Sequence, residues 1–270
     1  MRDIDSDECH NLLIAIASSF DEICRRHQIP YYMIGGTMLG AIRHKGFIPW
    51  DDDMDFGVER RYIPQLLRAL AEELPPHLKI RTLDNCENIF YGFYKIEDIR
   101  TEVNYHWHQE TSGMGISIDI FPLDHGRNGF FPTKLFAVYI FFLLIIKDYI
   151  YFNPANRRGF KKWIAKFLRL TNVVPVRKRL KHIDYLISKH TKVSSPYFVN
   201  YHGRWRTKEI MPKIIFGTPQ VYPFENIILP GIEQPDVYLT ALYGDYMQLP
   251  PEEQRFNHSI RKLYKIHQNV

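Results

Sequence analysis

Four aspartates fall within five positions of the segment FIPWDDDMDFGVER, residues 47–60, and only a methionine interrupts them. Acidic and apolar residues alternate there as Asp53, Met54, Asp55 and Phe56. Because this alternation has the two-residue period of a half-buried strand, the two carboxylates should share one face and the apolar side chains the other. Carboxylates fixed side by side repel one another until a proton or a cation lies between them. A divalent cation with oxygen ligands, Mg²⁺ or Mn²⁺, is the expected occupant, and a solvated acidic turn is the alternative.

A third carboxylate comes from the segment GISIDIFPLD, residues 115–124. Isoleucines occupy alternate positions of this predicted strand, and Ser117 and Asp119 lie between them. An acidic residue on an otherwise apolar strand is costly to bury unless it is paired or binds a metal. Asp119 should therefore face the same polar site as Asp53 and Asp55.

A glycine turn precedes the acidic strand. The short apolar segment YYMI is followed by Gly35, Gly36 and a helix that we expect to begin at Thr37. Two glycines let the backbone approach a ligand closely, and a helix N-terminus presents free N–H groups, which is a geometry that binds phosphate. Arg43 and Lys45 follow and could neutralise phosphates, or could instead complement the C-terminal end of the helix dipole.

The segments around these motifs alternate between helical and strand patterns. Helical spacing of apolar residues predicts amphipathic helices over 7–27 and 61–74, and short apolar runs predict strands at 78–83 and 89–98. The mixture predicts an α/β (α+β) fold in which helices flank a mixed sheet. Between 127 and 195 the chain becomes mostly helical, first apolar and then basic, which indicates an inserted helical subdomain.

One stretch of this helical region raises the question of a membrane. The apolar run at residues 135–146 lies between Lys134 and Lys147 and is shorter than the ~20 residues of a spanning helix. It fits a buried or interfacial helix. The basic run that follows is interleaved with Trp163 and Phe167 and suits peripheral contact with an anionic membrane, or else is a solvated helix face. The acidic N-terminus does not resemble a signal peptide, so we expect a cytoplasmic protein.

Composition narrows the classes of partner. The net charge of +5 suits an anionic substrate or an anionic membrane surface, without the dense basic patches of nucleic-acid binders, so no nucleic-acid partner is expected. The three cysteines, Cys9, Cys24 and Cys86, are widely spaced and predict neither a disulfide framework nor a zinc site. The pair His106 and His108 is interpreted as structural, since no further metal ligand accompanies it.

A glycine turn, an Asp-x-Asp strand and a third aspartate on a later strand form the arrangement of the nucleotidyltransferase fold. In that arrangement carboxylates bind one or two Mg²⁺ ions that contact phosphate oxygens. The stretch IGGTMLGAIRHKGFIPWDDDMDFGV closely resembles the signature of the LicD family, the phosphocholine and related phosphotransferases related to fukutin. The resemblance continues through YGFYKIEDIRTEVN, SIDIFPLD and YGDYMQLPPEEQR, and covers most of residues 28–256.

The resemblance implies transfer of a phospho-group from a CDP-linked donor. In the best-known family members this group is phosphocholine from CDP-choline, and the acceptor is a hydroxyl on a cell-surface glycan or its lipid-linked precursor, as in lipopolysaccharide, teichoic acid or capsule. Together with the change to a helical pattern, it predicts three regions. They are a nucleotidyltransferase-like catalytic core at 1–126, a helical insertion at 127–195 that is a candidate for membrane or acceptor docking, and a C-terminal segment at 196–270 that completes the LicD-type domain.

Site residues are carried over from the family only where the motifs match. The phosphate turn corresponds to Gly35, Gly36 and Thr37, with Arg43, Lys45 and Lys95 as further phosphate contacts. The catalytic metal ligands correspond to Asp53, Asp55 and Asp119, and Asp119 is also the candidate for assisting deprotonation of the acceptor hydroxyl.

Two other activities share this site. A nucleotidyltransferase would transfer a nucleoside monophosphate instead, and a polyol-phosphate transferase would transfer ribitol or glycerol phosphate. A non-catalytic protein of the same fold is disfavoured because the carboxylates and both glycines are present. Choline would need an aromatic box for its quaternary ammonium. Aromatic residues are available near the site in sequence, or belong to the core: Tyr91, Phe93, Tyr94, Tyr105 and Trp107.

Overall fold

The computed structural model of the chain describes residues 2–86, 89–105, 114–151, 159–170, 172–189, 195–255 and 260–265. By their contacts these residues form two compact units, which we describe separately. The first unit comprises Met1–Arg81, Phe93–Leu123 and Pro212–Val270, and the second comprises Thr82–Gly92 and Asp124–Met211.

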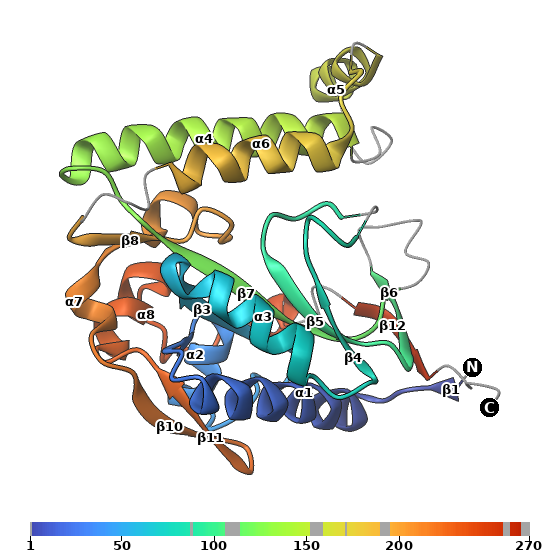
Figure 1. Cartoon of the computed structure of the whole chain (residues 1–270), viewed down its shortest axis with the longest axis vertical. Coiled ribbons are helices and arrows are strands. Elements are labelled where there is room, and N and C mark those ends of the chain that lie inside the picture. The colour runs from blue at the N-terminus through green and yellow to red at the C-terminus, as the bar shows by residue number, and fades with distance from the viewer. Residues whose placement is uncertain are drawn as a thin grey trace. The chain divides into compact units, whose positions relative to one another are not determined.

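The first unit is built on a mixed sheet with the strand order β10-β11-β2-β3-β7-β5-β4 (Figure 1). β3 and β7 pair in parallel, as do β11 and β2, whereas β2 with β3 and β5 with β7 are antiparallel. The predicted mixed sheet flanked by helices is thereby confirmed. Its strands are β2 (Tyr32–Met33), β3 (Asp55–Glu59), β4 (Leu78–Arg81), β5 (Tyr94–Asp98), β7 (Ser117–His125), β10 (Gln220–Phe224) and β11 (Ile227–Gly231).

Helices pack on this sheet through apolar faces. The spacing of Leu13, Ile16 and Phe20 buries one side of α1 (Ser6–Arg26), and the side chain of Asp5 caps its N-terminus by accepting from Glu8 N–H at 2.8 Å. α1 contacts β11, β5 and α3. The remaining helices of the unit are α2 (Gly35–Arg43), α3 (Ile63–Glu73), α7 (Lys213–Phe216) and α8 (Pro235–Tyr243), with 3-10 turns η1 (Arg60–Tyr62) and η4 (Glu252–Gln254).

The core beneath the acidic strand is aromatic. The rings of Phe20, Tyr31 and Phe56 form a triangle with centroid distances of 4.7 to 5.6 Å. Phe56 is fully buried, and so is Met54 just before β3. Burying a side chain of this size stabilises the fold by roughly 2 kcal/mol. The backbone that carries the aspartates is therefore held in place by side chains packed in the core.

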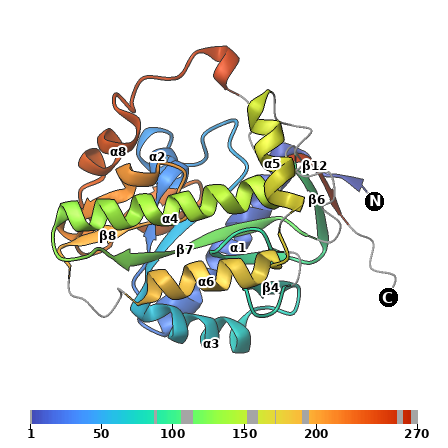
Figure 2. The same cartoon turned by 90° about the horizontal axis from the view of Figure 1, so that it is seen from above.

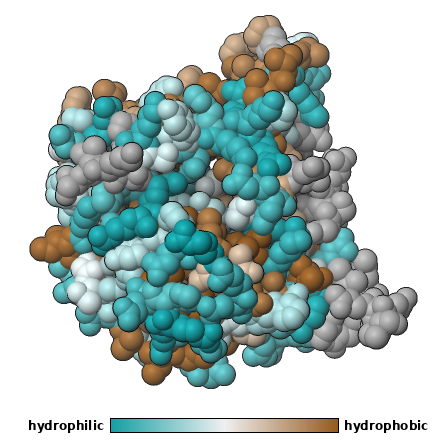
Figure 3. Space-filling model, viewed as in Figure 1, coloured by the Kyte–Doolittle hydropathy of each residue, from teal (hydrophilic) through white to brown (hydrophobic). Residues whose placement is uncertain are grey.

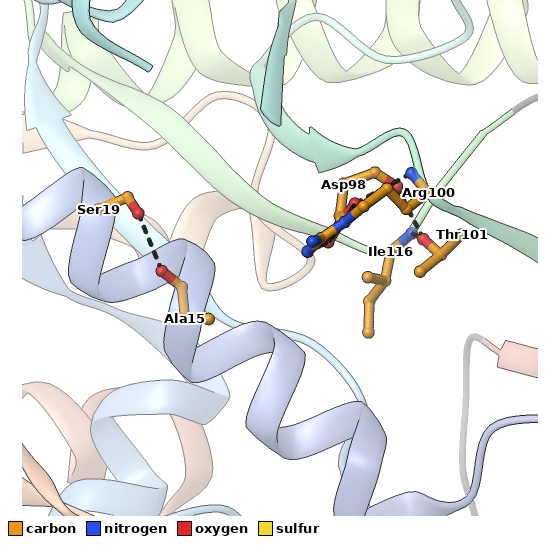
Figure 4. A network of polar contacts seen from close by, with 6 residues as sticks. All are labelled: Ala15, Ser19, Asp98, Arg100, Thr101 and Ile116. Atoms are coloured by element: carbon orange, nitrogen blue, oxygen red, sulfur yellow. Dashed lines mark hydrogen bonds and ion pairs between the residues drawn. The ribbon is translucent and has the colours of Figure 1, made fainter. Parts of the chain in front are cut away.

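A polar network fixes the turn that follows β5 and ties it to Ile116, the residue before β7. The Arg100 guanidinium forms two-pronged hydrogen bonds with the buried carboxylate of Asp98 at the end of β5. The hydroxyl of Thr101 donates to the Asp98 carbonyl at 2.8 Å and accepts from the N–H of Ile116 at 2.8 Å (Figure 4). β5 and β7 are thus locked together next to the turn. Thr101 is also the first residue of β6 (Thr101–Tyr105), which forms a small separate sheet with β12 (Ile260–Lys265) and β1 (Arg2–Asp3).

The second unit contains the helices expected in the helical region. Figure 2 shows α4 and α6 side by side, with α5 at the C-terminal end of α4. Its elements are α4 (Phe130–Tyr151), α5 (Phe160–Leu170), α6 (Val176–Ser188), η3 (Arg206–Glu209), β8 (Tyr197–Val199) and β9 (Ile210–Pro212). One apolar cluster joins α4, α6, β8 and β9, formed by Ala137, Ile140, Phe141, Ile183, Ile187, Val199, Tyr201 and Ile210.

Several predicted boundaries differ from the observed ones. α2 begins at Gly35 and not at Thr37, so both glycines belong to its first turn. The apolar run at 135–146 is the middle of the 22-residue helix α4, which by length and composition could cross a membrane, although a third of its most apolar window is buried inside the protein. The helix is therefore longer than the apolar run alone indicated, and the prediction of a buried or interfacial helix stays a prediction.

Candidate active site

Asp55 and Asp119 are neighbours across the parallel strands β3 and β7, whose register places them opposite each other. The N–H of Asp119 donates to the carbonyl of Met54 at 2.8 Å, so the pairing extends to the residue before β3. Met54 and Phe56 are fully buried, whereas Asp55 is partly exposed. The alternation seen in the sequence thus directs Asp55 away from the core and towards Asp119.

Three more aspartates lie immediately before β3. Each of Asp51, Asp52 and Asp53 offers one carboxylate oxygen, and these oxygens lie within 4.8 Å of one another. Asp52 is buried, while Asp51 and Asp53 are partly exposed. Oxygen donors at this spacing form a ligand set suited to a hard divalent cation.

These carboxylates influence one another electrostatically. Burial, followed by the charges of Asp53 and Asp119, raises the pKa of Asp55 well above its usual range, and the charge of Lys95 opposes that shift. Burial and the charge of Asp53 likewise raise the pKa of Asp51. Because each ionised carboxylate disfavours ionisation of the next, the group takes up protons or cations collectively.

Lys95 forms an ion pair with Oδ1 of Asp119. β5 and β7 are antiparallel neighbours, and their register places the two residues opposite each other. Burial raises the pKa of Asp119 to about 6, against the lowering effect of Lys95. Lys95 therefore balances the charge of Asp119 in this structure, and its predicted contact with a donor phosphate stays a prediction.

The first turn of α2 lies against the aspartates. A Cβ atom on Gly36 would lie 2.8 Å from Oδ2 of Asp51, and one on Gly35 would lie 3.2 Å from Oδ2 of Asp55. Gly35 also has a φ of +55°, which is a backbone conformation that favours glycine. Its N–H donates to the hydroxyl of Tyr238 at 3.0 Å. The glycines thus bring the positive end of the α2 dipole into contact with two carboxylates.

Thr37 connects α2 to the acidic strand. Its side chain is buried, and Oγ1 accepts a hydrogen bond from the N–H of Asp55 at 2.7 Å. The carbonyl of Asp55 in turn accepts from the N–H of Ile34 at 3.1 Å. Thr37 therefore fixes the position of Asp55, and direct contact with phosphate stays a prediction.

Arg43 and Lys45 lie at the other end of α2. The Arg43 guanidinium donates to the Tyr246 carbonyl at 2.8 Å and to the ring of His44 at 2.9 Å. Lys45 is exposed with a φ of +61°, and its carbonyl accepts from the N–H of Glu225 at 2.8 Å. These contacts stabilise the end of α2, and the predicted role of both residues in phosphate binding stays a prediction.

Comparison with known proteins adds to this geometry. The model of a family described as LicD/FKTN/FKRP, nucleotidyltransferase domain, matches residues 28–166, which is more than half of the chain and includes every aspartate and glycine of the site. The chain belongs to the LicD family. It is 29% identical over 275 residues to a lipopolysaccharide cholinephosphotransferase LicD of Haemophilus influenzae, and the similarity covers 95% of each chain.

A shorter similarity concerns an uncharacterised protein of Rickettsia typhi. The two chains are 49% identical over 93 residues, which is 31% of this chain and 29% of the other. The family and the extent of the LicD similarity confirm the predicted family and the predicted enzyme class: this LicD-family chain is a phosphotransferase.

Asp51 was missing from the predicted site of this LicD-family chain. The two-residue strand period selected Asp53 and Asp55, but β3 begins only at Asp55, so that period does not apply to the residues before it. The carboxylate of Asp51 lies closest to the position of a Gly36 Cβ. The run of four aspartates was the signal that could have found it.

His10 is a second residue that the sequence did not reveal. Its ring stacks on Phe47 with a centroid distance of 3.9 Å, and its Nε2 is hydrogen-bonded to the carbonyl of Asp51 at 2.8 Å. The ring thereby holds the backbone of the aspartate loop from α1. Because 41 residues separate His10 and Asp51, no local pattern predicts this contact.

The aromatic residues considered for choline fall in different places. Phe93 stacks on Phe121 with a centroid distance of 4.4 Å, and the ammonium of Lys95 lies 5.3 Å from the Phe93 ring. Phe93 is therefore an aromatic neighbour of Lys95, the ion-pair partner of Asp119. Trp107 and the pair His106 and His108 lie outside the described residues.

Proposed function

We propose that the chain transfers phosphocholine from CDP-choline to a hydroxyl of lipopolysaccharide or of its lipid-linked precursor. The observation that carries this proposal is that Asp51 and Asp55 lie against the first turn of α2, while Asp119 lies opposite Asp55 across β3 and β7. Similarity over nearly the full length to a lipopolysaccharide cholinephosphotransferase supports the choice of group and acceptor.

The residues fit a magnesium or manganese ion. The donor set consists of carboxylate oxygens, which these hard cations prefer, and burial followed by mutual repulsion raises the pKa values of Asp51 and Asp55. Asp51, Asp53, Asp55 and Asp119 would hold the ion. When bound, it would neutralise charge on the phosphate oxygens of the donor.

The other groups of the chain would position the donor and accept a proton. The glycines of α2 leave room for a phosphate beside the helix N-terminus, whose N–H groups and dipole favour negative charge. Asp119 would accept the proton of the acceptor hydroxyl, since burial raises the pKa of its carboxyl above the usual value. Lys95 keeps that carboxylate oriented through its ion pair.

A second candidate is a nucleotidyltransferase that moves a nucleoside monophosphate. The description of the matching family domain favours it, since the fold and the site serve both reactions. Polyol phosphates, such as ribitol or glycerol phosphate, are further candidates for the transferred group within the first reaction class. The location of the reaction, at the cytoplasmic face of a membrane, also stays a prediction.

The donor can be identified by measuring nucleotide release. Purified protein is incubated with Mg²⁺, lipopolysaccharide and one donor at a time, namely CDP-choline, CDP-ribitol, CDP-glycerol, ATP or CTP. The proposal predicts CMP release from CDP-choline that depends on the acceptor and disappears in Asp55→Asn. CMP release only from a CDP-polyol would contradict the assignment of choline, and pyrophosphate release from ATP or CTP would favour the nucleotidyltransferase.

A further inference from the structure

The helix α4 presents a continuous apolar stripe on its exposed side. The stripe consists of residues spaced at helical period, each between 47% and 75% exposed: Phe131, Leu135, Val138, Tyr139 and Phe142. Contiguous exposed apolar side chains of this size mark a surface that is covered by a partner or a membrane.

The opposite side of α4 belongs to the core of its own unit. Ala137, Ile140 and Phe141 are buried in the apolar cluster together with α6. The buried ammonium of Lys147 donates to the carbonyl of Phe90 at 2.7 Å. A helix that uses one side for packing and the other for a partner fits a position in the plane of a membrane surface better than a span through it.

The neighbouring helix α5 is amphipathic in the manner of a membrane-surface helix. Its exposed aromatic and aliphatic residues are 66% to 86% exposed: Phe160, Trp163, Phe167 and Leu170. Exposed basic residues accompany them: Lys161, Lys162, Lys166 and Arg169. The Lys166 ammonium lies 5.4 Å from the Trp163 ring. Figure 3 shows hydrophobic atoms gathered over α5.

The charge of this region indicates what covers it. Residues 149–183 contain ten lysines and arginines and no aspartate or glutamate, whereas the whole chain has a net charge of only +5. The rest of the chain is therefore net negative. A second copy of the same face would bring like charges together, which disfavours self-association. An anionic lipid surface complements both the charge and the apolar side chains.

We propose that the exposed sides of α4 and α5 form a docking face for an anionic lipid bilayer. The docking face is defined by Phe131, Leu135, Val138, Tyr139, Phe142, Phe160, Trp163, Phe167 and Leu170 together with Lys161, Lys162, Lys166 and Arg169. Its apolar side chains enter the headgroup region, and its basic side chains contact lipid phosphates. This inference goes beyond the proposed reaction and does not depend on it.

The charge component can be tested with vesicles and the full-length protein. The protein should float with vesicles of phosphatidylglycerol and phosphatidylethanolamine, and not with vesicles of phosphatidylcholine alone. Added salt should weaken the binding. Replacing both lysines, Lys162→Gln with Lys166→Gln, should lower the affinity about tenfold or more at low salt. The matched control, Arg68→Gln with Lys79→Gln, removes two exposed positive charges from the first unit and should leave binding unchanged.

Insertion of the aromatic residues can be tested separately. Lipids brominated in the upper acyl chain should quench the fluorescence of Trp163 when the protein binds. Trp163→Phe should bind almost as well and lose that part of the quenching, whereas Trp163→Ser with Phe167→Ser should bind weakly. Both positions are exposed, so circular dichroism should show an unchanged fold.

Four outcomes would overturn the proposal. The first is that the unmutated protein does not bind anionic vesicles at low salt. The second is that the control variant Arg68→Gln with Lys79→Gln loses as much vesicle affinity as the lysine variant. The third is a dimer that is disrupted by Leu135→Ser with Phe142→Ser, which would assign the face to a second copy. The fourth is retention in cell membranes after alkaline carbonate extraction, which would indicate that α4 spans the bilayer. No donor or acceptor is present in the vesicle assays, so their failure leaves the proposed reaction untouched.

Discussion

Oδ2 of Asp51 lies 2.8 Å from the position that a Cβ atom of Gly36 would occupy. A helix N-terminus and a carboxylate are therefore in contact at the centre of the candidate site. The helix dipole favours negative charge at this end of α2, whereas burial and the neighbouring carboxylates raise the pKa of Asp51 well above its usual range. A donor phosphate and a metal ion would meet at the same point.

Gly36→Ala should move the carboxylate and leave the fold intact. The end of a flexible side chain can give way, so the change in the free energy of unfolding should be small, while affinity for Mg²⁺ and donor should fall. Isothermal titration calorimetry and thermal unfolding check the two effects. In an Asp51→Asn background the same glycine substitution should have less effect on affinity, and equal losses in both backgrounds would show that the two residues act independently.

Asp55→Asn should lower activity on the order of a thousandfold and leave the protein folded. The substitution removes a carboxylate that repels Asp53 and Asp119, so the metal-free protein should be as stable as the unmutated one or more stable. Mg²⁺ should raise the melting temperature of the unmutated protein and have little effect on the variant. Near-normal activity of the variant at saturating Mg²⁺ would remove Asp55 from the site.

Lys95→Met should destabilise the metal-free protein because it leaves Asp119 buried without its ion-pair partner. Loss of one member of a buried pair costs about 3 kcal/mol or more. The loss should be larger near pH 8 than near pH 5, since Asp119 can take up a proton at the lower pH. Urea unfolding at both pH values measures this. The double variant Lys95→Met with Asp119→Asn should recover most of the stability. A loss of stability in Lys95→Met that is the same at both pH values would contradict the account.

Glu209 should make stability depend on pH in the second unit. Burial raises the pKa of this carboxyl from 4.5 to about 7, although it accepts a hydrogen bond from the N–H of Trp205. Because the folded-state pKa lies above the unfolded one, the contribution is fully present below pH 4.5 and is lost as the pH rises through about 7. The loss is on the order of 3 kcal/mol. Urea unfolding should show that the free energy of unfolding of Glu209→Gln falls less between pH 4.5 and 7 than that of the unmutated protein. The same pH dependence in both proteins would refute this prediction.

The local sequence pattern predicted part of the site, and the rest depends on contacts between segments that are far apart in the sequence. Alternation indicated the orientation of Asp55, because it reports burial within one strand. The pairing of Lys95 with Asp119 could not be predicted, since it depends on the strand order that places β5 beside β7. His10 and the backbone of Asp51 meet only after α1 has packed against the fold.

The helical region shows the same limit. Its composition predicted helices and a basic character, and the structure contains α4, α5 and α6 there. The extent of α4 and the division of its surface into a buried and an exposed side depend on contacts with α6, which the apolar run alone does not reveal.

The mass of the acceptor after reaction tests the central claim most directly. Lipopolysaccharide or its core oligosaccharide is incubated with the protein, CDP-choline and Mg²⁺, and is then analysed by mass spectrometry beside a reaction with Asp55→Asn. The account predicts a gain of one phosphocholine group per modified hydroxyl, with release of CMP, and no gain with the variant. A gain of a cytidylyl group, or an equal gain of phosphocholine with Asp55→Asn, would contradict it.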